Sequence, residues 1–187
     1  MTKLLQFVLE KSASFIERLD EVILLKKGLV LIDIQRGFIS DNTERVVGRI
    51  PNLFEKYKFS CVMATQFKNV SNSPYERFLN WEGLKNEDSQ EIVPEIRRYA
   101  DKIFVKYGYS CFTNEFEQFV EQEKFDRLYF AGIDTDCCVL KSALDCFERG
   151  IDLRVLYDCC ASNGGKSSEE AAKIIMMRSI GKNQIIV

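Results

Sequence analysis

The sequence predicts a three-layer α/β fold in which helices cover both faces of a six-stranded, mostly parallel sheet. Three observations predict it. Six short apolar runs lack the polar alternation of half-exposed strands, and helix-like segments separate these runs. The chain has 187 residues, 46% of them hydrophobic, which is enough to bury one large core.

The expected strands are rich in Val, Ile, Leu and aromatic residues, as is typical of strands that are buried on both faces. They span 29–34, 61–65, 103–105, 128–133, 153–157 and 185–187. Because helical segments connect them, the strands are expected to run parallel.

The expected helices lie between these strands, at 42–57, 90–100, 113–124, 138–149 and 167–180. Thr113 precedes a first turn that contains acidic residues, which is typical of a helix start. Gly150 and Gly181 follow apolar periodic segments and indicate helix ends. The stretch 67–89 is the one long irregular connection, and a connection of that length is often a lid or a binding loop.

The N-terminal segment differs from the rest. Residues 1–27 are expected to form a helical extension and residues 28–187 the main domain, because apolar side chains recur at helical spacing across 3–25. This helix either covers the domain or contributes to a subunit contact. Charged residues interrupt its apolar run, so it is expected to be neither a secretory signal nor a membrane span.

The composition excludes several partners and sites. A net charge of −2 does not suit a nucleic-acid-binding protein. An odd count of seven cysteines without a signal peptide suggests the reducing cytoplasm. The sequence contains no histidine, which excludes Ser–His or Cys–His catalysis and any imidazole metal site. The adjacent pairs Cys137-Cys138 and Cys159-Cys160 would chelate one metal poorly, so we expect no metal and no cofactor.

Three reactive residues follow three separate expected strands. Asp33 ends the first run, Lys106 follows the third, and Cys138 opens the helix after the fourth. In open α/β sheets, ligands bind outside the carboxyl ends of the strands. A helix start also favours a thiolate at Cys138.

Each residue has a simpler interpretation when it is taken alone. Asp33 would be a turn carboxylate, Lys106 an exposed lysine, and Cys138 a buried apolar thiol. Their occurrence together at strand ends favours a hydrolytic site, in which a thiol acts with a carboxylate and an ammonium group.

Four segments resemble the isochorismatase-like cysteine hydrolases. The segment 31–38 is similar to the first-strand motif of that superfamily, 106–112 to its lysine segment, 132–139 to its nucleophile motif, and 158–162 to the loop after its fifth strand. The resemblance runs in order from about residue 28 to 187. The nucleophile segment is the most specific of the four.

The resemblance implies the sheet order 3-2-1-4-5-6 and the catalytic residues Asp33, Lys106 and Cys138. It selects Cys138 over Cys137, because the family's nucleophile immediately precedes the valine. It also implies a cis peptide bond between Ile133 and Asp134, an oxyanion hole made by the N–H groups of Asp134 and Cys138, and a homo-oligomer. The implied reaction cleaves the C–N bond of a small molecule through a thioester.

The same resemblance makes Gln35, in the first-strand motif, a candidate for substrate binding. Phe38, Trp81 and Tyr107 are candidate pocket walls, or else ordinary core residues. Nicotinamidases carry an Asp/His/His metal site, which this chain lacks the histidines to build. Three other functions stay open: ether cleavage by Asp33 without the thiol, a silent small-molecule binding protein, and a redox role for the adjacent cysteines.

Overall fold

The computed structural model describes residues 25–187. The expected helix at 3–25 falls almost entirely outside them. Among the described residues, six strands form a single sheet of order β3-β2-β1-β4-β5-β6, and every neighbouring pair is parallel. The strands are β1 (Lys27–Ile32), β2 (Cys61–Phe67), β3 (Lys102–Lys106), β4 (Arg127–Ile133), β5 (Leu153–Ala161) and β6 (Ile185–Ile186). The expected fold and strand order are confirmed.

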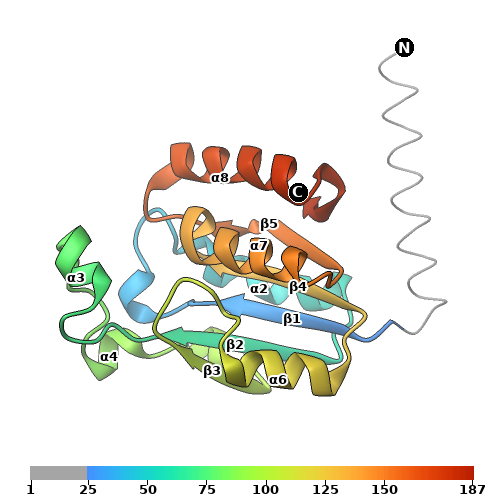
Figure 1. Ribbon diagram of the computed structural model, residues 1–187, viewed down its shortest axis with the longest axis horizontal. Coiled ribbons are helices and arrows are strands. Elements are labelled where there is room, and N and C mark those ends of the chain that lie inside the picture. Colours follow the sequence, from blue (N-terminus) through green and yellow to red (C-terminus); the bar gives the residue numbers. More distant parts are fainter. Residues whose placement is uncertain (1–24) are drawn as a thin grey trace, which may run out of the picture.

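Helices cover both faces of this sheet (Figure 1). They are α2 (Arg45–Lys56), α3 (Pro74–Leu79), α4 (Glu87–Gln90), α5 (Pro94–Arg97), α6 (Asn114–Glu123), α7 (Leu140–Glu148) and α8 (Gly165–Ser179). Short turns of other helical types are η1 (Arg36–Phe38), η2 (Thr135–Val139) and η3 (Lys182–Gln184).

Two buried clusters fill the space between the layers. One packs the sheet against α6, α7 and α8, and includes Phe116, Ala143 and Met176. The other packs the opposite face against α2 and α5, and includes Ile50 and Ile96. Buried apolar side chains on both faces explain why the strand sequences show no polar alternation.

The segment between β2 and β3 is more regular than the sequence suggested. The stretch 67–89 contains α3, which begins at the N-cap Ser73 with Pro74 in its first turn. Of the helix expected at 90–100, the structure forms only α5, and α4 ends at Gln90 before it. Ile92 forms a bridge with Gln35, and Val93 before Pro94 has a ψ of 126°, which is not helical, so the helix cannot run through this point.

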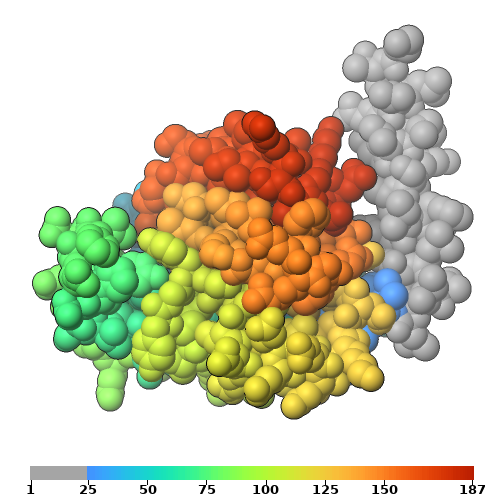
Figure 2. Space-filling view, in the orientation of Figure 1, coloured from blue at the N-terminus to red at the C-terminus, as the bar shows by residue number. Residues whose placement is uncertain are grey.

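All six strands point towards the same end of the molecule, where α3 and α4 lie (Figure 1). The space-filling view shows the α3 segment, in green, projecting at this end (Figure 2). Within residues 25–187, no helix has the length and apolar character needed to cross a membrane.

Candidate active site

Asp33 follows β1 in an unusual backbone conformation. Its φ of +49° lies in the left-handed region, which few residues other than Gly, Asn and Asp adopt. Thr65 on the neighbouring strand β2 stabilises this turn, because its hydroxyl accepts from the Asp33 N–H at 3.1 Å and donates to Oδ1 at 2.6 Å. The carboxylate is completely buried. Its second oxygen, Oδ2, therefore points in a direction fixed by the strand pair β1–β2.

Lys106 is the last residue of β3, and its side chain is 1% exposed. Its ammonium group lies 2.7 Å from Asp33 Oδ2. It also donates to the carbonyl oxygens of Gly108 at 2.8 Å and Tyr109 at 3.0 Å, because the chain turns back over the ammonium group. The ring of Phe67 lies 5.2 Å away, at cation–π distance. Lys106 is thus held at the sheet end rather than exposed to solvent.

Cys138 completes the group. It lies in η2, the π-helical turn that joins β4 to α7, and its Sγ is 3.4 Å from the Lys106 ammonium group. The structure therefore brings together all three residues that the sequence selected from three strand ends.

The charges of the three groups are strongly coupled. Burial raises the pKa of the Cys138 thiol well above its ordinary value, and the negative charge of Asp33 raises it further, while Lys106 opposes both. A helix start favours a thiolate, but burial and the charge of Asp33 act against ionisation of this thiol. Burial alone would lower the pKa of Lys106, but the charges of Asp33 and of a Cys138 thiolate raise it above its ordinary value.

The turn before Cys138 has the expected cis peptide bond between Ile133 and Asp134. The carbonyl oxygen of Asp134 accepts from the N–H groups of Cys137 at 3.2 Å and Val139 at 3.0 Å. Among the turn and loop hydrogen bonds of residues 25–187, none uses the N–H of Asp134 or Cys138 as its donor. The oxyanion hole that the resemblance implies at these two N–H groups stays a prediction.

A cavity of about 120 Å³ opens beside the sulfur. It is lined by Phe38, Phe67, Tyr75, Leu79, Trp81, Tyr109, Asp134, Cys137 and Cys138. The rings of Phe38 and Trp81 stack with 7° between their planes and 5.9 Å between their centroids. Burial, followed by the charge of a Cys138 thiolate, raises the pKa of Tyr75 to about 12, so its hydroxyl stays protonated. The cavity is mainly aromatic, with one carboxylate from Asp134.

Two of the expected substrate-binding residues are not brought to this cavity. Gln35 is buried, and its side-chain amide pairs with the Phe67 backbone and with the Gln90 carbonyl, so it joins β2 to α4. Tyr107 is 60% exposed and lies outside the lining. Phe38 and Trp81 do line the cavity, as the sequence suggested.

Sequence reasoning missed two tyrosines and an asparagine at the site. Tyr75 comes from α3, in the stretch that was expected to be irregular, where the Ser73-Pro74 pair was the readable signal of a helix. Tyr109 follows Lys106 by three residues, in the lysine segment. Asn163 contacts Asp134 across the chain, and no local pattern indicates that contact.

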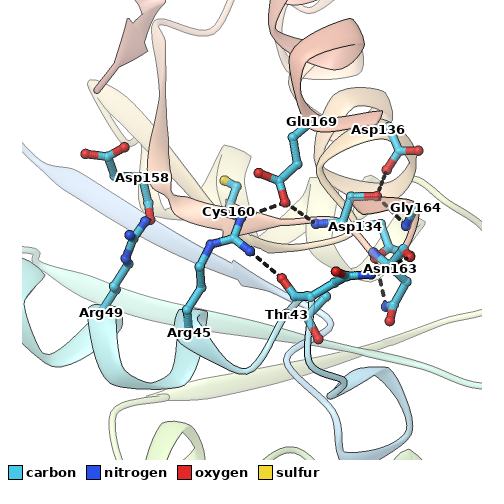
Figure 3. A network of polar contacts seen from close by, with 12 residues as sticks. Thr43, Arg45, Arg49, Asp134, Asp136, Asp158, Cys160, Asn163, Gly164 and Glu169 are labelled. Carbon is cyan, nitrogen blue, oxygen red and sulfur yellow. Dashed lines mark hydrogen bonds and ion pairs between the residues drawn. The ribbon is translucent and has the colours of Figure 1, made fainter. Parts of the chain in front are cut away.

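Asn163 belongs to a polar network that connects the loop after β5 to the nucleophile turn (Figure 3). Its backbone N–H and its side-chain Nδ2 both donate to Asp134 Oδ1, at 2.8 Å and 3.0 Å. Nδ2 also donates to the Phe38 carbonyl, and Oδ1 accepts from Ser40 Oγ. Asn163 therefore fixes Asp134 relative to the aromatic wall.

The same network extends to α2 and α8 (Figure 3). Arg45 donates to Glu169 at 2.6 Å, and Glu169 also accepts from the Ser162 N–H at 3.2 Å. Ser162 Oγ donates to Asp136 in η2. Two helices on opposite faces of the sheet thus support the turn that carries Cys138.

The residues do not fit the Asp/His/His metal site of nicotinamidases. The sequence has no histidine. Within the described part of the chain, no group of three or more His, Cys, Asp or Glu side chains is arranged to hold a metal ion.

Comparison with known proteins places these features in a family. The isochorismatase domain model matches residues 27–184. Isochorismatase family protein 1B of Dictyostelium discoideum is 28% identical over 158 residues, which are 79% of this chain and 69% of that protein.

Solved structures show the same fold. N-carbamoylsarcosine amidase from Thermoplasma acidophilum superposes with a TM-score of 0.70 at 22% identity, over 84% of this chain and 94% of that one. Nicotinamidase from Bacillus subtilis superposes with a TM-score of 0.68 at 22% identity, over 84% of this chain and 97% of that one.

Proposed function

Because the chain belongs to the isochorismatase domain family, we propose that it is a cysteine hydrolase that cleaves the C–N bond of a small amide or ureide. One observation carries this proposal. The Cys138 sulfur lies 3.4 Å from the Lys106 ammonium group, which in turn lies 2.7 Å from the Asp33 carboxylate. A nucleophile, a base and a cation beside a cavity are the parts that thiol-dependent hydrolysis requires.

The first step is proton transfer. Burial and the charge of Asp33 raise the pKa of the Cys138 thiol, so the thiol is protonated in the resting site. Asp33 accepts the proton while the sulfur attacks the substrate carbonyl carbon. Lys106 stabilises the charge on sulfur as it forms, so the thiolate exists only when the substrate is in place.

Attack produces a tetrahedral oxyanion. The N–H groups of Asp134 and Cys138, which make no turn hydrogen bonds among the described residues, would donate to it. The C–N bond then breaks, and Asp33 returns its proton to the leaving amine. Water next attacks the thioester with Asp33 as base, the C–S bond breaks, and the thiol regains its proton.

A panel of small amides and ureides, assayed for ammonia release, tests the proposal. Cys138→Ala should lower turnover by at least ~1,000-fold. Cys61→Ser is the matched control, because Cys61 is a half-buried thiol at the opposite end of the sheet and should leave turnover unchanged. An acyl adduct trapped on the protein should map to the peptide position of Cys138 rather than Cys137. Turnover that survives Cys138→Ala would instead favour chemistry by Asp33 without the thiol.

The substrate-binding walls in this proposal are Phe38 and Trp81, together with Tyr75 and Tyr109. The homo-oligomer implied by the sequence stays a prediction, which light scattering on the purified chain checks.

A further inference from the structure

We propose that the carboxylate of Asp134 is a specificity site for a protonated amine, so that the preferred substrates are small amides whose non-reacting part carries a positive charge. This inference rests on the proposed function, because it concerns the substrate of the same cavity. It adds the charge of the substrate, which neither the fold nor the catalytic residues determine.

The first argument is the geometry of Asp134. Oδ1 accepts both hydrogen bonds from Asn163, at 2.8 Å and 3.0 Å (Figure 3). Oδ2 accepts no hydrogen bond from any residue in the range 25–187, and Asp134 lines the cavity. One oxygen therefore fixes the side chain, and the other is left for a donor on the ligand. A carboxylate held in this way is prepared to bind an ammonium group.

The second argument is the balance of charge around the cavity. No Lys or Arg is among the described residues that line it. The nearby ammonium group of Lys106 already contacts Asp33, two carbonyl oxygens and the Cys138 sulfur, and it has only three N–H donors. A substrate carboxylate would thus meet Asp134 without a compensating cation, and like charges at short range are repelled.

The third argument is the aromatic lining. Stacked Phe38 and Trp81 lie in the same cavity as Asp134. The face of an aromatic ring attracts a cation, and Trp does so most strongly. The carboxylate and the rings therefore favour the same sign of charge. Because Asp134 would contribute both its backbone N–H and its carboxylate, the amine should lie within a few bonds of the reacting carbonyl.

Three matched probes test the charge preference: 3-(aminomethyl)benzamide, 3-ethylbenzamide and 3-carbamoylbenzoate. They share the ring and the carboxamide, and carry a positive, zero and negative charge. Trp81 is the only tryptophan of the chain, so its fluorescence reports on cavity occupancy without turnover. Titrations use the Cys138→Ala protein, and ammonia release is measured with the unmodified protein.

The cationic probe should bind about 10- to 100-fold more tightly than the anionic one, because this is the range of affinity that a hydrogen bond to a charged group contributes. Asp134→Asn keeps the acceptor for Asn163 and should reduce this ratio about tenfold. Asp136→Asn is the matched control, since it removes an equal charge from the same turn but from a residue outside the cavity lining, and should change the ratio less than twofold.

The outcomes separate the two proposals. If the anionic probe binds as well as the cationic one, or if Asp134→Asn leaves the ratio unchanged, the amine site is refuted while Cys138-dependent hydrolysis stands. If the cationic probe binds with the expected preference but no amide of the wider panel is hydrolysed, the amine site stands and the hydrolase proposal fails.

Discussion

Replacement of Lys106 by Met tests the buried charge pair directly. The Lys106 and Asp33 side chains are 1% and 0% exposed, with the ammonium nitrogen 2.7 Å from the carboxylate oxygen. Removing one partner of such a pair leaves a buried charge without compensation, at a cost of about 3–5 kcal/mol. Met fills most of the same space, so a cavity adds little to that loss.

Urea denaturation of Lys106→Met should therefore give a free energy of unfolding about 3–5 kcal/mol below that of the unmodified protein. In a chain of this length each kcal/mol corresponds to about 2–4 °C, so the midpoint of thermal unfolding should fall by about 6–20 °C. The double variant Asp33→Asn with Lys106→Met removes both charges. It should recover about 2–3 kcal/mol of the loss, although the Gly108 and Tyr109 carbonyls stay without their donor.

The reasoning is refuted if Lys106→Met lowers the free energy of unfolding by less than ~1 kcal/mol. That value is typical of a solvated surface pair. The reasoning is also refuted if the double variant Asp33→Asn with Lys106→Met is less stable than Lys106→Met alone. That result would mean that Asp33 carries no uncompensated charge in Lys106→Met.

The nucleophile, the polar network and one glycine can be tested in the same way. Because burial and the charge of Asp33 raise the pKa of Cys138, its alkylation by iodoacetamide should be slow at pH 7 and still accelerate above pH 9; a plateau near neutral pH in peptide mass data would indicate a preformed thiolate. Arg45→Ala leaves Glu169 with the Ser162 N–H alone, and should lower the urea-derived free energy of unfolding by about 1–3 kcal/mol, whereas Glu169→Gln should cost about 1 kcal/mol; equal losses would contradict this. Gly132→Ala should lower the free energy of unfolding by about 3 kcal/mol, because φ is +134° and a Cβ would lie 2.1 Å from the Ile32 oxygen. Gly108→Ala has open space around the added Cβ and should leave the midpoint of thermal unfolding nearly unchanged, which a thermal scan of both variants checks.

The sequence was most informative where strand periodicity and residue chemistry coincide. Asp33, Lys106 and Cys138 could be found because each follows an apolar run, and the ends of parallel strands meet at one edge. The order of the strands came from the resemblance, since apolar runs indicate that a strand exists and not which strand lies beside it.

Features that depend on contacts between distant parts of the chain could not be predicted from the sequence. The direction of the Tyr107 and Tyr109 side chains depends on how the chain turns over the Lys106 ammonium group, and the sequence favoured the wrong tyrosine. Gln35 has the chemistry of a substrate ligand, but its amide is paired with backbone groups near β2 and α4. The helix start that favours a thiolate at Cys138 is a local pattern, whereas the burial that opposes ionisation is a property of the whole fold.

The pairing of β1 with β4 also affects how the protein acquires activity. Lys27 is aligned with Arg127, so these neighbouring strands are separated by 100 residues of chain. Contacts between such distant segments form late and slowly during folding. Asp33 and Lys106 come before β4 in the sequence, and Cys138 comes after it. A nascent or partly folded chain in which β1 and β4 are not yet paired therefore cannot bring the three residues together. Regain of enzymatic turnover after dilution from denaturant should therefore lag behind regain of helical circular dichroism.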